Sequence, residues 1–224
     1  RFLANTSVSA KRPMYTIQRP AMVVRSSVHE PWGRLVTARR SVAACSSSNT
    51  PACRHSPASG AAATGASAGE GAGAGTNINV PLPAGSGDGA YWSVVDEVAG
   101  PGIRAFKPDL IFVSSGFDPS ALDPLGRMSV TSGGFRGIAE RLLAIADEVC
   151  DGRIVFSHEG GYSAVHVPFC GIAVLEALSG VRTDVEDPFN LSVGESPTRE
   201  LTEWQSDVIG RSAELARALG LIVD

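Results

Sequence analysis

Near the middle of the chain lies an unbroken apolar run, Leu110-Ile111-Phe112-Val113, with Pro108-Asp109 before it and Gly116-Phe117-Asp118 shortly after it. Such a run between turn-forming residues is typical of a strand that is covered on both faces, as in a parallel sheet. A second run of this kind, Ile154-Val155-Phe156, leads into Glu159-Gly160-Gly161-Tyr162. The two runs therefore predict two buried strands, each followed by a loop that contains glycine.

Helices are expected between and after these strands. Between them, Thr131 or Ser132 serves as an N-cap, and apolar side chains then recur at steps of three and four: Phe135, Ile138, Leu142, Ile145 and Val149. After the second strand, residues 164–178 predict another helix, which Gly180 closes. The first of these helices would connect the two strands.

Two more elements are expected on the N-terminal side. Asn77-Ile78-Asn79-Val80 alternates as a short strand does, and prolines follow it. Asp88 is expected to cap a helix that continues to about Phe106, with a kink at Pro101. The order along the chain is then strand, helix, strand, helix, strand and helix.

The final helix is expected to open at Ser196-Pro197 and to carry Leu201, Trp204, Val208, Leu215 and Leu219.

Alternating strands and helices form βαβ units, so the predicted fold class is α/β, with a mostly parallel sheet and helices on both faces. Ligands bind such sheets beyond the carboxyl ends of the strands. Residues 116–118 and 159–162 lie at those ends, which makes them the candidate functional residues.

Charge divides the chain into two unlike parts. Residues 1–69 hold nine basic residues and a single acidic one, Glu30, whereas residues 70–224 hold 22 acidic and ten basic residues. The acidic part argues against nucleic-acid binding by the folded region.

No apolar run is long enough to span a membrane. The four cysteines form neither a zinc-finger spacing nor a disulfide framework, so a reducing, intracellular compartment is expected.

Residues 1–69 show no sustained helical or alternating periodicity, and we expect a disordered leader there. Its composition, rich in arginine and serine and poor in acids, is that of an organelle transit peptide. Non-native sequence from a GC-rich region is an alternative of equal weight. The predicted organisation is a leader over residues 1–69, a domain over residues 70–190, and a C-terminal helical extension of that domain over residues 191–224.

Three blocks of the sequence resemble the histone deacetylase superfamily. Residues 116–126, Gly-Phe-Asp-Pro-Ser-Ala-Leu-Asp-Pro-Leu-Gly, are similar to its GFDA…DPLG block, and residues 159–162 are similar to its EGGY block at a matching separation. Residues 70–83 resemble its glycine-rich loop and its N-x-N-x-P-L-P strand. The sequence around Pro168-Phe169-Cys170-Gly171 most resembles the class II-like branch, which includes bacterial amidohydrolases. The resemblance implies that residues 70–190 are the C-terminal half of such a domain, and three ordered motifs make it specific.

The resemblance implies the arginase/deacetylase fold and a zinc-dependent amidohydrolase that removes acetyl groups from acetyl-lysine or acetylated amines. In the family, two Asp and one His hold the zinc, which polarises the carbonyl and supplies a water of lowered pKa. A His pair moves protons, and a Tyr hydroxyl donates to the oxyanion. By motif, Asp118 is one zinc ligand and Tyr162 is the catalytic oxyanion donor, while Leu125, Gly160 and Gly161 contact the substrate.

The same residues have simpler interpretations. Asp118 stands before a proline and could be a turn residue that accepts backbone N–H bonds, and Tyr162 could be a half-buried packing residue. The motifs favour the functional interpretation of both. Asp123 is expected to hold its loop through hydrogen bonds, and Glu159 to support the neighbouring loop. His158 is interpreted as a hydrogen-bonded core residue and is not assigned to the site.

The family's other zinc ligands and its proton-shuttling histidines are expected in the first half of the domain, as an adjacent His-His pair and an Asp-x-His motif. The chain has four histidines, none adjacent to another and none two positions after an Asp: His29, His55, His158 and His166. One carboxylate cannot hold a catalytic zinc, which takes three protein ligands. Two hypotheses follow, a truncated and inactive portion of a deacetylase, or a non-catalytic interaction or regulatory module.

The missing half of the domain would leave a strand edge and an apolar sheet face uncovered, through which chains could form an oligomer. The excess of acidic residues over residues 70–224 suits a cationic substrate, such as a lysine-rich tail or a polyamine. The expected location is the cytoplasm, the nucleus or an organelle, the last if the leader is a transit peptide.

Overall fold

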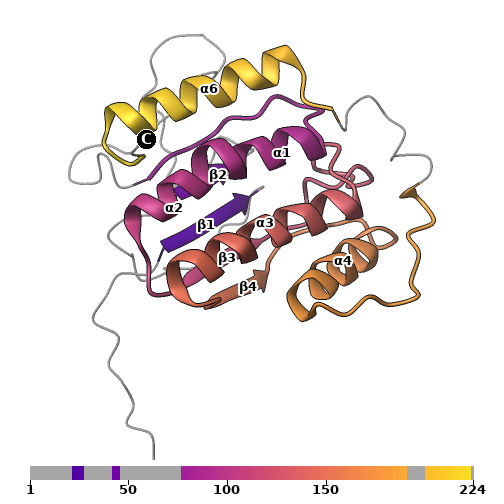
Figure 1. The fold of residues 1–224 in the computed structure, drawn as a ribbon. Helices are drawn as coiled ribbons and strands as arrows, with labels where there is room; N and C mark the ends of the chain where they lie inside the picture. Colours follow the sequence, from indigo (N-terminus) through magenta and orange to yellow (C-terminus); the bar gives the residue numbers. More distant parts are fainter. Residues whose placement is uncertain (1–21, 28–41, 46–76, 191–199, 223–224) are drawn as a thin grey trace, which may run out of the picture.

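A computed structural model describes residues 22–27, 42–45, 77–190 and 200–222 of the protein (Figure 1). Within this part of the chain a four-stranded sheet has the order β2-β1-β3-β4. The strands are β1 (Met22–Ser27), β2 (Val42–Cys45), β3 (Ile111–Ser115) and β4 (Ile154–His158), and every neighbouring pair is parallel. The two strands expected from the apolar runs are therefore β3 and β4, and the predicted parallel α/β fold is confirmed.

Strands β1 and β2 correct the expectation that residues 1–69 contain no regular structure. β1 pairs with β3 in a register that places Met22 opposite Ile111, so β3 has a neighbour on both sides. The sequence around Met22 gives little local signal because the apolar residues are few and are followed by Arg25 and two serines. Pairing with a buried strand supplies the stabilisation that local propensity lacks. The other residues of the predicted leader lie outside the described ones.

Strand β4 is less buried than its apolar sequence predicts, since Val155 is 45% exposed. The reason is its place in the sheet, because in the described part of the chain β4 pairs only with β3 and forms an edge. The predicted strand at residues 77–80 is also corrected. Only Asn79 forms a bridge there, although Ile78 and Val80 are buried in the core.

The predicted helix from Asp88 to Phe106 is confirmed, and its central turn is π-helical. It consists of α1 (Asp88–Val94), a π-helical segment η3 (Val95–Ala99) and α2 (Gly100–Phe106). Pro101 has no N–H to donate to the preceding turn, and the π-helical segment ends two residues before it, next to the position where a kink was expected.

Asp88 does not cap this helix, because the N-cap position is occupied by Gly87. The fully buried Asp88 carboxylate instead accepts hydrogen bonds from the Thr131 N–H at 2.8 Å and the Thr131 hydroxyl at 2.7 Å. Thr131 in turn caps α3 (Ser132–Cys150), since its hydroxyl oxygen accepts the Gly134 N–H at 2.9 Å. The N-cap predicted at position 131 is therefore confirmed, and the buried Asp88 carboxylate holds the capping residue in place.

The two C-terminal helices begin later than their sequence patterns predict. Helix α4 (Val167–Ser179) starts after a turn at residues 164–166 and ends, as predicted, at Gly180, whose φ is +69°. Helix α6 (Glu203–Ala218) starts at a capping box formed by Thr202 and Gln205, and residues 200–202 are not helical. Ser196-Pro197, where this helix was expected to open, lies outside the described residues. Trp204, expected on the buried face, is 61% exposed.

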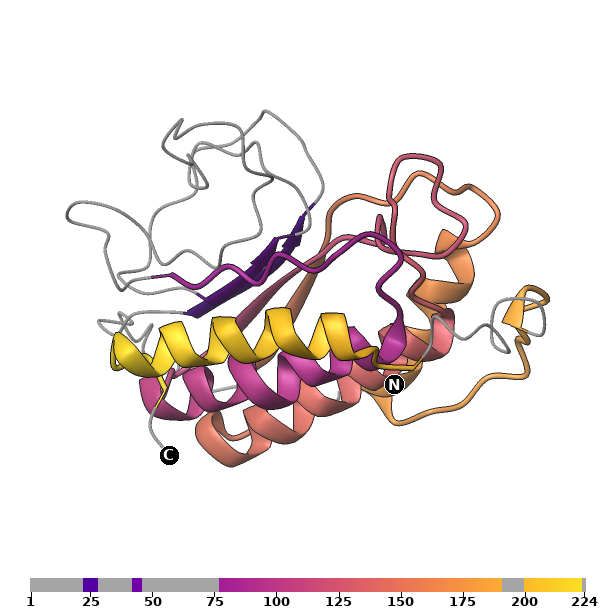
Figure 2. The same cartoon turned by 90° about the horizontal axis from the view of Figure 1, so that it is seen from above.

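The helices α1, α2, α3 and α6 lie side by side on one face of the sheet (Figure 2). α4 packs against α3 (Figure 1). Apolar side chains from the helices and from β3 are completely enclosed between these layers: Val98, Ile103, Ile111, Leu142 and Ile209. None of the helices in the described ranges is long and apolar enough to cross a membrane.

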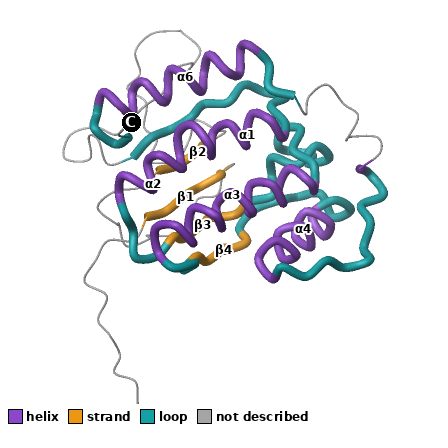
Figure 3. The backbone as a smooth tube through the Cα atoms, in the orientation of Figure 1, coloured by secondary structure: helices purple, strands orange, loops and turns teal. Residues whose placement is uncertain are grey.

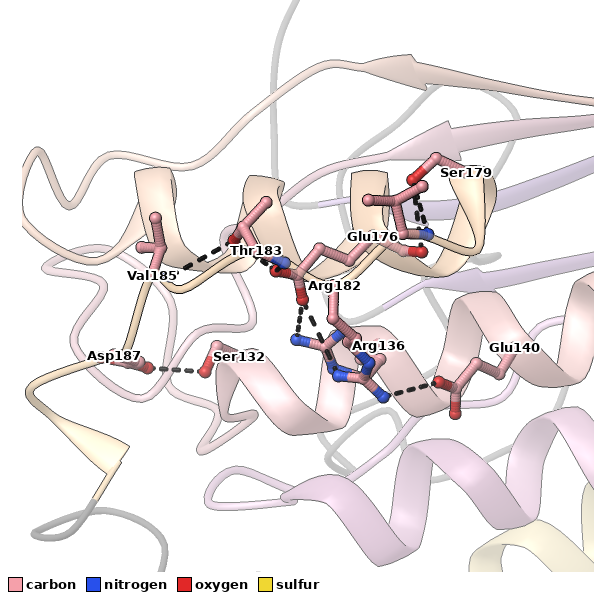
Figure 4. A network of polar contacts seen from close by, with 10 residues as sticks. Ser132, Arg136, Glu140, Glu176, Ser179, Arg182, Thr183, Val185 and Asp187 are labelled. Carbon is pink, nitrogen blue, oxygen red and sulfur yellow. Dashed lines mark hydrogen bonds and ion pairs between the residues drawn. The ribbon is translucent and has the colours of Figure 1, made fainter.

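A polar network holds the segment after α4 onto α3 (Figure 4). At its centre the Glu176 carboxylate lies 2.5 Å from the Arg136 guanidinium and accepts the Thr183 N–H at 2.7 Å. Further along the segment, the Ser132 hydroxyl donates to the Asp187 carboxylate at 2.6 Å. These contacts connect α4, the following segment and the N-terminal part of α3.

Candidate functional site

Two loops meet at the carboxyl ends of β3 and β4. Residues 116–130 follow β3 and residues 159–166 follow β4, and the loops lie together at one end of the sheet (Figure 3). Their backbones are joined directly, because the Phe117 N–H donates to the Gly160 carbonyl at 2.7 Å and the Glu159 N–H donates to the Ser115 carbonyl at 3.1 Å. The structure thus brings the two candidate motifs into contact, as a parallel sheet requires.

Asp118 lies at the centre of this junction. It is 1% exposed, and its buried Oδ1 atom has no hydrogen-bond partner. Burial raises the pKa of the Asp118 carboxyl, while N–H groups of Asp118 and Gly161 lower it to a smaller extent. A buried carboxylate oxygen without a donor is costly unless a ligand completes it, so this atom fits a role as a cation ligand.

Glycines allow both loops to close around Asp118. A Cβ atom at Gly160 would lie 2.5 Å from each carboxylate oxygen of Asp118, and a Cβ atom at Gly126 would lie 1.9 Å from the Asp118 carbonyl oxygen. Gly161 has a φ of +128°, a conformation that residues with side chains rarely adopt. The glycines at these positions therefore serve the close packing of the loops as well as any approach to a substrate. The importance of Gly126 was missed, because its contact with Asp118 arises only in the folded loop.

Tyr162 follows the two glycines and is 38% exposed, so it reaches the surface of the site. Its N–H donates to Oδ2 of Asp123 at 2.7 Å. Oδ1 of Asp123 accepts the N–H groups of Leu125 at 2.9 Å and Gly126 at 2.7 Å. Asp123 therefore holds its loop through hydrogen bonds, as predicted.

The remaining predicted residues lie around this junction. Leu125 is 62% exposed on the loop after β3, where its assignment to the substrate channel stays a prediction. Glu159 supports its loop as expected, because its carboxylate accepts the Ser114 hydroxyl at 2.5 Å. His158 is exposed rather than buried in the core, and its ring centroid lies 5.0 Å from that of Phe117.

The described residues do not complete a zinc site. Within residues 77–190 and 200–222 and the two N-terminal strands, no three or more His, Cys, Asp or Glu side chains gather in a position to hold a metal ion. Asp118 fits the role of one ligand by its burial and its unpartnered oxygen, but a catalytic zinc takes three protein ligands. The residues present therefore do not fit the whole metal centre.

Comparison with known proteins identifies the family. The histone deacetylase domain model matches residues 34–178, which is more than half of the chain. The chain belongs to the histone deacetylase family. The match begins within the stretch that was set apart as a leader, and it includes strand β2.

Individual relatives agree with this assignment. The chain is 41% identical over 133 residues to the histone deacetylase-like amidohydrolase of Pseudomonas aeruginosa, an alignment that covers 59% of this chain and 34% of that protein. It is 42% identical over 119 residues to histone deacetylase 10, chloroplastic, of Oryza sativa subsp. japonica, which covers 52% of this chain and 26% of the rice protein. The chain thus spans about a third or less of the length of these relatives.

Solved structures show the same fold. The structure of the histone deacetylase Clr3 matches 89% of this chain and 32% of its own chain, with a TM-score of 0.65 and 21% identity. The HDA15 HD domain matches 90% of this chain and 52% of its own, with a TM-score of 0.59 and 25% identity. The predicted arginase/deacetylase fold is confirmed, although the described part of the chain contains only one candidate metal ligand.

Proposed function

We propose that this deacetylase chain supplies part of the catalytic site of an amidohydrolase that removes acetyl groups from acetyl-lysine or acetylated amines. The observation that carries the proposal is the junction at the ends of β3 and β4. There the unpartnered carboxylate oxygen of Asp118 is buried beneath the loop that presents Tyr162 at the surface. The relatives that carry the name deacetylase or amidohydrolase support the reaction class.

The two residues have different tasks in this proposal. Asp118 would be one of the ligands of a zinc ion, which would polarise the acetamide carbonyl once the remaining ligands are supplied. The Tyr162 hydroxyl donates a hydrogen bond to the oxygen that becomes negatively charged when the carbonyl is attacked. Gly160 and Gly161 carry no side chain between Tyr162 and Asp118, so the substrate can approach the backbone there, and Leu125 lines the entrance.

We further propose that the 224-residue chain is inactive, or nearly so, by itself. The support is the ligand count, since Asp118 is the one candidate metal ligand among the described residues and the sequence contains neither a His-His pair nor an Asp-x-His motif. The same count favours the second candidate function, a non-catalytic interaction or regulatory module. The two candidate functions differ in one expectation. In the first, the junction supports catalysis once the other zinc ligands are provided, and in the second it does not.

A chimeric enzyme tests this difference. The 133 residues of the chain that align with the Pseudomonas aeruginosa amidohydrolase replace their counterparts in that protein. We expect the chimera to hydrolyse an acetyl-lysine peptide or an acetylated polyamine. Tyr162→Phe should lower kcat by about 10²–10³-fold, the effect of removing one oxyanion donor. Asp118→Asn should reduce turnover to background.

The control is Asp184→Asn, which changes an exposed aspartate outside the two loops and should leave turnover unchanged. A folded chimera that hydrolyses neither substrate would support the non-catalytic module. An active chimera that tolerates Asp118→Asn and Tyr162→Phe would contradict the tasks assigned to these residues.

The leader is a separate part of the proposal. Two relatives are named chloroplastic, histone deacetylase 10 of rice and histone deacetylase 14 of Arabidopsis thaliana. Their names favour the transit-peptide interpretation of the basic N-terminal residues over the non-native one. A fluorescent protein fused after residue 21, before the first strand of the sheet, should enter an organelle if this interpretation holds, and a signal confined to the cytoplasm would contradict it.

A further inference from the structure

One carboxylate binds both loops of the junction. Asp123 is 8% exposed, and its two oxygens face different partners. Oδ1 accepts two N–H groups from its own loop, those of Leu125 and Gly126, at 2.9 and 2.7 Å. Oδ2 accepts the N–H of Tyr162, in the loop after β4, at 2.7 Å. The three donors are backbone groups, so the bridge depends on the acceptor at position 123 and not on the side chains of its partners.

The backbone between the two loops explains why this bridge matters. The Phe117 N–H fixes the Gly160 carbonyl at 2.7 Å, and Gly160 packs against the carboxylate of Asp118. Tyr162 lies two positions further on, beyond Gly161, whose φ is +128°. Glycine adopts many backbone conformations at little cost. The fixed position of Gly160 therefore does not by itself set the direction of the backbone after Gly161. The bond from Tyr162 to Asp123 fixes the chain beyond the glycine.

We propose that Asp123 is a positioning residue whose carboxylate sets the place of Tyr162 relative to Asp118 by binding the two loops together. This inference rests on the proposed function, because it takes Asp118 as the metal ligand and Tyr162 as the oxyanion donor. Asp123 itself touches neither substrate nor metal in this scheme. It acts through the backbone of Tyr162.

The proposal requires a carboxylate and not merely a side chain of similar shape. An ionised aspartate offers two oxygens that only accept, and all of its partners here are N–H donors. Asparagine has the same size but offers one oxygen and an NH₂ group. Its oxygen would face the two donors of Leu125 and Gly126, which turns the NH₂ group towards the N–H of Tyr162. Asp123→Asn therefore removes the bond between the loops and keeps those within one loop.

Amide hydrogen exchange in the full 224-residue chain tests this prediction residue by residue. In Asp123→Asn we expect the exchange of the Tyr162 amide to become at least about tenfold faster, as for the loss of a hydrogen bond to a charged acceptor. The Leu125 and Gly126 amides should keep their protection. Core amides such as Leu142 and Ile209 report the stability of the whole fold, and Asp184→Asn is the matched control.

Each outcome decides the question. Unchanged exchange of the Tyr162 amide would overturn the positioning role, and so would an equal loss of protection at Tyr162 and in the core. Asp123→Asn in the chimera described above adds an independent measurement, a lower kcat at a nearly unchanged KM. If Tyr162 loses protection as expected but the parent chimera is inactive, the proposed function fails and the loop bridge stands.

Discussion

At Asp118 a single side chain combines features that a structural turn residue does not need. The turn interpretation accounts for the N–H groups of Asp118 and Gly161 beside the carboxyl, but it leaves Oδ1 buried without a partner. Burial raises the pKa of this carboxyl and so disfavours its ionised form. A cation bound nearby would favour the ionised form. The sequence was enough to select Asp118 as a candidate ligand from its residue type and motif. It showed the glycines only as members of the motif, because their contacts with the carboxylate depend on how the loops fold.

The enclosing glycines lead to a prediction for Gly160→Ala. The new methyl group would lie 2.5 Å from both carboxylate oxygens of Asp118, so one of the loops must shift. We expect the free energy of unfolding to fall by about 1–3 kcal/mol, the usual cost of overpacking. Urea unfolding followed by circular dichroism measures this change.

Gly210→Ala is the matched control, because nothing lies within 4 Å of a Cβ atom at this position in α6. Alanine is the better helix former, so this variant should gain up to about 1 kcal/mol. Equal stability of Gly160→Ala and the parent chain would show that the loops do not close tightly around Asp118.

At the scale of secondary-structure elements, α3, α4 and the segment after α4 are joined by the carboxylate of Glu176. Its Oε1 atom accepts the Thr183 hydroxyl at 2.5 Å and the Thr183 N–H at 2.7 Å, and its Oε2 atom lies 2.5 Å from the Arg136 guanidinium. These contacts, those of Thr183 foremost, lower the pKa of Glu176 from 4.5 to about 2. The ionised form is therefore the one that stabilises the fold.

The direction of this pKa shift predicts how stability depends on pH. The contribution of Glu176 is fully present above its unfolded pKa of 4.5 and is lost as pH falls towards about 2. Glu176→Gln should be less stable than the parent chain at pH 7, and the difference should shrink across this acidic range. The free energy of unfolding, measured at intervals of pH, gives the difference directly. In Glu214→Gln, an exposed change on α6, the pH profile should match that of the parent.

Elements with strong local signals were predicted well, and those that depend on partners were not. β3 and α3 have a continuous apolar run and a capped, periodic pattern, and both lie where the sequence places them. β1 is short and interrupted by polar residues, and it is stabilised by pairing with β3. The start of α6 was misplaced because Ser-Pro is a common helix opening, whereas the capping box at Thr202 and Gln205 determines the start.

At the scale of the whole molecule, most of the chain shows the family, whereas the candidate site rests on a single junction of two loops. Residues 34–178 match the histone deacetylase domain, and the fold agrees with solved deacetylases. The junction of the β3 and β4 loops contributes one candidate ligand and one candidate oxyanion donor. The sequence could predict both from motifs, together with the loop-holding role of Asp123. It could not predict that Asp123 divides its two oxygens between the loops, because this depends on how two distant segments pack.

The zinc content of the purified 224-residue chain, measured by elemental analysis after dialysis against a trace of zinc, tests the central claim most directly. With Asp118 as the one candidate metal ligand among the described residues, the chain should hold close to no zinc, and Asp118→Asn should leave that value unchanged. A ratio near one zinc per chain that is lost in Asp118→Asn would contradict the account. The chain would then assemble a complete metal site by itself.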